Sequence, residues 1–195
     1  MKHRLLLAFA LVIVAFGGAQ PGYHVAAQGK WVTLLDGKSL KGWDVVGNAN
    51  WSVADGAVQA SMGNGYLVSP MSYTDFEIEA EFWVTDDANS GIFIRCSDPK
   101  MISAMNAYEV NIYDKRPDQS YRTGAIVDVA KPLAQINTGG KWSKMTITAK
   151  GPRMTVAING TKTVDAQDNK HPAGPFALQY GAGTVKWRSV KIRTL

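Results

Sequence analysis

The chain has 195 residues, of which 46% are hydrophobic, and a formal net charge of +5. This modest charge, with no run of basic residues longer than two, argues against a nucleic-acid-binding protein. The single cysteine, Cys96, excludes an internal disulfide, and the three histidines, His3, His24 and His171, are too few and too scattered for a usual zinc site. We therefore expect no metal and no other cofactor.

The first residues form a pattern typical of a secretory signal peptide. Lys2 and Arg4 precede an apolar run over residues 5–16, and small residues follow. We expect cleavage after Ala27, with Ala19 as the alternative site. The apolar run is shorter than the roughly 20 residues that span a membrane, so an uncleaved anchor is the less favoured interpretation. No cysteine directly follows either cleavage site for lipidation, because the only one is Cys96, so a secreted or periplasmic protein is expected.

Removal of residues 1–27 leaves residues 28–195, enough for a single domain with its own core. Apolar residues alternate with polar ones in this part, and helical periodicity is absent. Asp55-Gly56 and Asn159-Gly160 have the composition of tight hairpin turns. The expected strands lie at 31–35, 51–60 (two strands around the turn), 65–70, 75–84, 90–96, 107–113, 123–130, 142–150, 153–159, 161–166, 174–180 and 184–195. The pattern predicts an all-β sandwich of two antiparallel sheets.

Two neighbouring segments, NSGIFIRC (89–96) and AYEVNIYD (107–114), carry polar residues among large apolar ones. If Ile92, Ile94, Val110 and Ile112 face the core, their neighbours in the sequence face outward. The same parity argument applies to Gln179 in GPFALQY. The residues expected on this outer face are Phe93, Arg95, Glu109, Asn111, Tyr113 and Gln179.

An outer face of this composition suits a sugar. Aromatic rings stack on the C–H faces of sugars, and amide, carboxylate and guanidinium groups bind their hydroxyls. The plainer alternative is a set of solvated side chains, in which an Arg–Glu pair contributes roughly 0–1 kcal/mol. A second alternative is a two-carboxylate glycosidase that uses Glu109 with Asp114. It is less favoured because Asp114 has the wrong strand parity unless the strand bulges.

Segments in the same order resemble the 3-keto-disaccharide hydrolase family. They are WVTLLDGKSLKGW, NSGIFIR, YEVNIYD, TGAI, Trp142, ING and ALQYG with VKWRSVKI, and they extend from about residue 31 to 194. The resemblance implies a concanavalin A-like (lectin/glucanase) sandwich of the jelly-roll type. It also implies a small carbohydrate or glycoside ligand, whose identity and linkage the sequence leaves open.

The chemistry implied by the resemblance is hydrolysis of 3-keto-glycosides. The C3 ketone acidifies the C2 proton, a base removes that proton, and the aglycone leaves before water adds. Glu109 is then the expected base, and Arg95 the group that steadies the enolate oxygen. Asn111, Gln179, Tyr113 and Phe93 are the expected substrate-binding residues.

One departure from the family pattern bears on activity. Many members carry a histidine shortly after the Leu-Gln of the penultimate strand, where this chain reads Leu178-Gln179-Tyr180-Gly181. Three hypotheses therefore stand: a glycoside-cleaving hydrolase, a non-catalytic lectin-like binding module of the same fold, and a structural or protein-interaction sandwich. The sequence does not indicate an oligomeric state.

Overall fold

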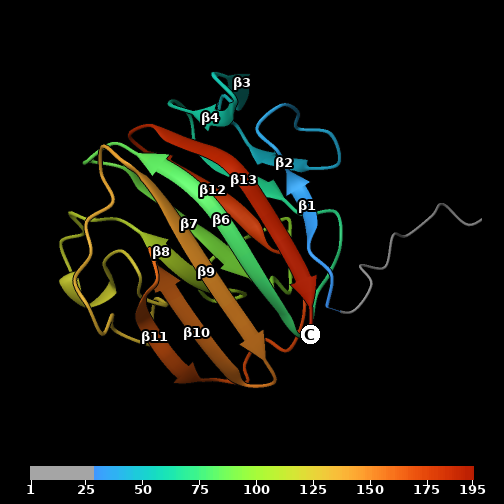
Figure 1. Cartoon of the computed structure of the whole chain (residues 1–195), viewed down its shortest axis with the longest axis vertical. Coiled ribbons are helices and arrows are strands. Elements are labelled where there is room, and N and C mark those ends of the chain that lie inside the picture. The colour runs from blue at the N-terminus through green and yellow to red at the C-terminus, as the bar shows by residue number, and fades with distance from the viewer. Residues whose placement is uncertain (1–28) are drawn as a thin grey trace, which may run out of the picture.

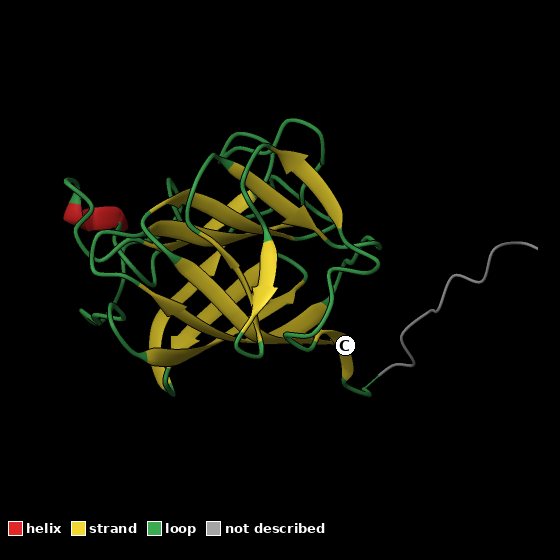
Figure 2. Cartoon of the chain, turned by 90° about the horizontal axis from the view of Figure 1, so that it is seen from above, coloured by secondary structure: helices red, strands yellow, loops and turns green. Residues whose placement is uncertain are grey.

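The computed structural model describes residues 29–195, and the expected signal peptide at 1–27 lies outside them. Two antiparallel sheets pack face to face (Figures 1 and 2). One sheet has the order β11(Thr161–Gln167)-β10(Arg153–Ile158)-β9(Trp142–Lys150)-β6(Phe76–Val84)-β13(Val185–Thr194)-β4(Ala57–Ala60)-β3(Ser52–Ala54), with β1(Val32–Leu35) also on β13. The other has the order β2(Asp44–Gly47)-β5(Gly65–Val68)-β12(Ala177–Ala182)-β7(Asn89–Ile94)-β8(Tyr108–Ile112). The predicted all-β sandwich is confirmed.

Strand β6 shows why the larger sheet forms. Its residues alternate strictly between buried and half-buried over Phe76–Val84. The buried set packs against the inner face of the other sheet, and the acids Glu77, Glu79 and Glu81 point outward. Each acid meets a cation on a neighbouring strand of the same sheet. The period-2 pattern thus places the core on one face and paired charges on the other.

The five-stranded sheet differs because much of both its faces is buried. Ile92, Val110 and Leu178 face the main core between the sheets. Phe93 and Ala177 face away from it and join a smaller cluster with Ile102, whose loop between β7 and β8 folds over the outer face. This covering loop explains why β7 is buried almost continuously and does not alternate between buried and exposed residues.

The predicted strand at 123–130 is wrong. This segment is a loop that follows the edge of β8, where Asn111 N–H donates to Ala125 O at 3.0 Å and Val127 N–H donates to Glu109 O at 3.0 Å. Positive φ values at Gly124 (86°) and Asp128 (61°) prevent a regular pleat. Strand β2 was not predicted, and neither was the short 3₁₀ turn at Gln119–Tyr121.

Both predicted hairpin turns are present. Asp55 and Gly56 have φ values of 53° and 71°, and Asn159 and Gly160 have 50° and 82°. These left-handed pairs match the right-handed twist of the flanking strands. Cys96 is unpaired and buried, as expected for a small apolar side chain. Among residues 29–195, no helix has the length and apolarity needed to cross a membrane.

Candidate functional site

Strand register brings several of the predicted residues onto one face. Across the five-stranded sheet, Tyr66, Gln179, Gly91 and Asn111 lie in one row. Glu109 lies in the next row, opposite Phe93. Because paired residues project to the same side of a sheet, all of these point away from the main core. We call the set Tyr66, Gly91, Glu109, Asn111 and Gln179 the Glu109 face.

Glu109 is the most unusual group on this face. Its carboxylate is half-buried and has no hydrogen-bond or ion-pair partner among residues 29–195. Burial raises the pKa of Glu109 to about 7, Arg116 opposes this shift, and Asp128 adds to it. A carboxyl group with this pKa can both accept and release a proton near neutral pH.

Tyr66 and Gln179 lie next to one another on β5 and β12. The Tyr66 hydroxyl donates to Ile102 O at 3.3 Å, and its ring packs edge-on against Phe93 at 5.4 Å. Burial raises the pKa of Tyr66, a hydrogen bond from Gln179 opposes that shift, and Glu109 adds to it. The Gln179 Oε1 atom is buried and has no partner in the part of the chain that is described. Sequence reasoning missed Tyr66, although strand parity in GYLVSP would have placed it outward.

Asn111 holds the structure around the face. The residue is fully buried, and its Nδ2 donates to Tyr121 O at 2.5 Å, which ties the 3₁₀ turn to β8. Its Oδ1 has no partner among the described residues. Tyr113 lies one residue beyond β8, and its backbone N–H donates to Thr123 Oγ1 at 2.8 Å. Gly91 has no side chain, and a Cβ there would lie 2.9 Å from Val110 O and 3.5 Å from Gln179 Oε1, so a larger residue would be crowded.

The exposed aromatic face expected at Phe93 is not present. Phe93 points outward as parity predicts, but it is only 2% exposed because the β7–β8 loop covers it. Its ring therefore supports Tyr66 and is not accessible to a sugar. Asp44 and Val68 lie in the row of paired residues that contains Phe93, and they border a hollow of about 450 Å³ that Cys96 also lines.

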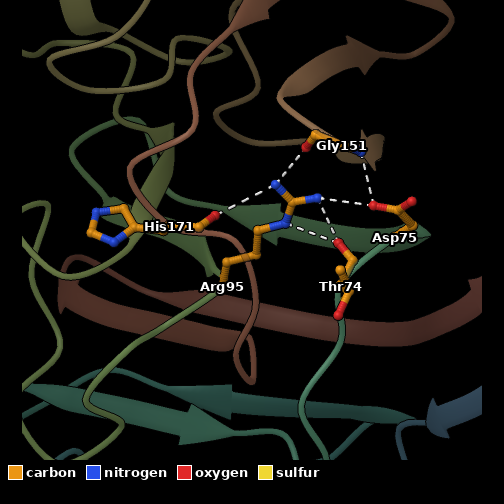
Figure 3. Close-up of polar contacts among 5 residues, drawn as sticks. All are labelled: Thr74, Asp75, Arg95, Gly151 and His171. Atoms are coloured by element: carbon orange, nitrogen blue, oxygen red, sulfur yellow. Dashed lines mark hydrogen bonds and ion pairs between the residues drawn. The ribbon is translucent and has the colours of Figure 1, made fainter.

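The predicted orientation of Arg95 is also wrong. Its φ of 55° breaks the strand alternation, so the side chain turns away from Glu109 and is 1% exposed. Its guanidinium donates to Thr74 O at 2.9 and 2.5 Å, to Gly151 O at 2.8 Å and to His171 O at 3.5 Å (Figure 3). Asp75 Oδ1 lies 3.4 Å away. Arg95 therefore joins three segments of the chain and is not available to a substrate at Glu109.

Asp114 does not form a catalytic pair with Glu109. Its carboxylate accepts hydrogen bonds from Thr123 Oγ1 at 2.5 Å, from Thr138 N at 2.6 Å and from Gly139 N at 2.9 Å. These bonds fasten two loops together, so Asp114 is a structural residue. Tyr180, near the family histidine position, is buried on the core side, where its hydroxyl donates to Gly183 O at 3.1 Å.

No three His, Cys, Asp or Glu side chains within residues 29–195 come together as metal ligands would. His171 is buried, and its ring packs edge-on against Tyr108 at 4.9 Å. Burial lowers the pKa of His171, Lys170 adds to this shift, and Asp168 opposes it. Glu109, which is half-buried and unpaired among the described residues, is the proton-transfer group that the geometry supports best.

Comparison with known proteins gives one family. The model of the 3-keto-alpha-glucoside-1,2-lyase-like domain matches residues 30–193. A 3-keto-disaccharide hydrolase of Bacteroides thetaiotaomicron is 26% identical over 190 residues, which cover 80% of this chain and 60% of that protein. A levanase of Bacillus subtilis is 25% identical over 167 residues, which cover 82% of this chain and 24% of that protein. The chain thus spans less than two thirds of either relative.

Solved structures share the fold. A Parabacteroides distasonis protein described as a candidate glycosyl hydrolase has a TM-score of 0.72 and 24% identity, covering 85% of this chain and all of that one. The carbohydrate-binding module CBM66 of Bacillus subtilis has a TM-score of 0.62 and 22% identity, covering 77% and 94%. These likenesses support the predicted jelly-roll sandwich of the lectin type.

Proposed function

The chain belongs to the 3-keto-alpha-glucoside-1,2-lyase-like family, and from this premise we propose that it cleaves a 3-keto-glycoside on the Glu109 face. The observation that carries the proposal is the Glu109 carboxyl, half-buried, unpaired among the described residues and with a pKa raised to about 7. A general base works best when its pKa lies near the operating pH. The family assignment supplies the substrate class.

In the proposed reaction, the Glu109 carboxylate removes the C2 proton, which the C3 ketone has acidified. The electron pair of that bond forms the C1–C2 double bond, the C1–O bond breaks, and the aglycone oxygen takes a proton from protonated Glu109 or solvent. Water then adds across the double bond and restores the 3-keto sugar. The base therefore returns to its ionised form in each cycle.

Charge on the C3 oxygen grows as the C2 proton leaves, so a hydrogen-bond donor is needed there. Because Arg95 is committed to backbone carbonyls and the Tyr66 hydroxyl already donates to Ile102 O, we assign this role to the side-chain amide N–H of Gln179, which lies beside Tyr66. The unpartnered Gln179 Oε1 would accept from a sugar hydroxyl. Arg116, whose charge acts on Glu109, would help to keep the base ionised.

A turnover assay on 3-keto-trehalose or a 3-keto aryl glucoside tests the proposal. We expect release of 3-keto-glucose by the wild type, with a rate that rises as the pH increases through about 7 because the base must be ionised. Glu109→Gln is expected to lower kcat by roughly 10²-fold or more. Glu79→Gln, which changes a half-buried carboxylate paired with Lys144 on the other sheet, is the matched control and should leave kcat unchanged. Equal rates in the two variants would remove Glu109 from the mechanism.

A second candidate is a non-catalytic carbohydrate-binding module. The likeness to CBM66 favours it, as does the absence of the family histidine pattern at Tyr180. It predicts saturable sugar binding by calorimetry, lost in Gln179→Ala, with no release of 3-keto-glucose by the wild type.

We also propose that the protein is exported and that residues 1–27 are removed. The basic start and the apolar run at 5–16 support this. Intact-mass measurement of the protein recovered outside the cytoplasm should give an N-terminus at Gln28, and a mass that retains Met1 would contradict export through this leader.

A further inference from the structure

The outer face of the eight-stranded sheet has an unusual end. Along most of this face, acids of β6 pair with cations: Glu77 with Arg193 at 2.7 Å and Glu79 with Lys144 at 3.2 Å. At the end of β6, however, Trp83 lies directly opposite Trp142 of β9. We call these two residues the Trp pair.

The Trp pair lies around a small hollow. Both rings line a space of about 170 Å³, together with Asp55, Ala57 and Lys186. Ala57 is only 1% exposed and has a short side chain, so it leaves depth between the larger groups. Trp142 remains 37% exposed, although large aromatic side chains are usually buried more fully.

Charges around the hollow nearly cancel. Lys186 lies 5.3 Å from the Trp83 ring centre, and Asp55, which has the opposite charge, lines the same hollow. Arg188 lies 4.4 Å from the Trp142 ring centre but is already paired with Glu81 at 2.7 Å. The hollow therefore combines aromatic walls with polar groups of both signs and no excess of either charge.

We propose that the Trp pair, with Asp55 and Lys186, forms a second carbohydrate site that binds a neutral glycan chain. Indole rings pack on the C–H faces of sugar rings, while the carboxylate and ammonium groups bind hydroxyls. The near-neutral charge favours a neutral polymer over an acidic one. This site lies on the opposite sheet from the Glu109 face, and it does not depend on the proposed catalysis. It would hold a polymer on one side while the other side remains free.

Affinity electrophoresis of the full chain tests the proposal, in cationic native gels cast with laminarin, dextran or xyloglucan. We expect at least one of these neutral polymers to retard the wild type, and Trp142→Ala to weaken that binding roughly fivefold to tenfold. Trp83→Ala should act in the same direction. The matched control is Trp31→Ala, because Trp31 is 38% exposed and lies 4.8 Å from Arg193 but lies outside the Trp pair.

Glu109→Gln separates the two sites, since it should keep full retardation. The proposal is overturned if none of the three polymers retards the wild type, or if Trp31→Ala and Trp142→Ala are retarded equally. It is also overturned if Glu109→Gln alone loses binding. A further gel cast with polygalacturonate, an acidic polymer, tests the charge argument, and retardation by this polymer alone would overturn the proposal as well. Light scattering at several protein concentrations tests whether a second copy of the chain, and not a glycan, packs on the Trp pair. A dimer that Trp142→Ala abolishes would make this face a contact between two copies of the chain and would overturn the proposal.

Discussion

Arg95 and Glu109 are two charged residues at neighbouring strands of one sheet, and the structure uses them in opposite ways. Arg95 directs all three of its nitrogens to backbone carbonyls of Thr74, Gly151 and His171. Glu109 is half-buried and has no such partner among the described residues. A buried charge whose bonds are satisfied stabilises the fold, whereas one left unsatisfied costs stability and is available for chemistry.

The largest effect is expected at the satisfied charge. Arg95→Leu should lower the free energy of unfolding by roughly 3–5 kcal/mol, because the carbonyls of Thr74, Gly151 and His171 lose the donor that the buried Arg95 supplies. Urea denaturation measures this change. The control is Arg153→Leu, which removes an exposed arginine paired with Asp165 and should lower the free energy of unfolding far less. Similar losses of unfolding free energy in the two variants would contradict the view that the buried, hydrogen-bonded Arg95 stabilises the fold more than an exposed arginine does.

The unpaired Glu109 carboxyl should make the free energy of unfolding depend on pH. The folded state keeps the Glu109 proton up to about pH 7, while the unfolded state releases it near 4.5, so stability falls as the pH rises through this window and levels off above it. The fall attributable to this group should be roughly 3 kcal/mol, from a pKa difference of about 2.5. Denaturation of the wild type and Glu109→Gln at several pH values isolates it. A stability difference between the two that does not vary from pH 4.5 to 8 would show an ordinary pKa.

A smaller effect on stability is expected at Tyr108, which contacts His171, one of the residues bonded to Arg95. The Tyr108 hydroxyl donates to Asp168 at 2.6 Å and accepts from His171 N–H at 3.0 Å. Tyr108→Phe should therefore lower the free energy of unfolding by about 1–2 kcal/mol. Tyr113→Phe is the comparison, because its hydroxyl has no hydrogen-bond partner among residues 29–195 and its removal should be nearly neutral. No difference between the two variants would mean that the Tyr108 bonds add little.

The smallest effect is expected at Glu79, a half-buried carboxylate at the surface of the larger sheet. Glu79 pairs with Lys144 at 3.2 Å on the outer face of the larger sheet. Glu79→Gln should change the free energy of unfolding by roughly 0–1 kcal/mol, since exposed ion pairs contribute little. The same denaturation series measures it at pH 7. A loss as large as that of Arg95→Leu would show that exposure is not what separates the two kinds of charge.

The sequence by itself determined the fold class and much of the Glu109 face. Strict alternation in 75–84, the hairpin-turn pairs Asp55-Gly56 and Asn159-Gly160, and the order of the family segments were enough to predict a two-sheet sandwich. Strand parity also placed Glu109 and Gln179 on one face, because a pleated strand points successive side chains to opposite sides.

Tertiary structure alone decided which polar residues are available. Parity assumes an extended backbone, and the positive φ of Arg95 ends that assumption at one residue. Parity also cannot show that a loop covers Phe93, or that the segment at 123–130 follows β8 without becoming a strand. Such coverage depends on segments distant in the chain that meet only after folding. Burial, and with it the raised pKa of Glu109, is therefore a property of the packed sheets and loops and not of the local sequence.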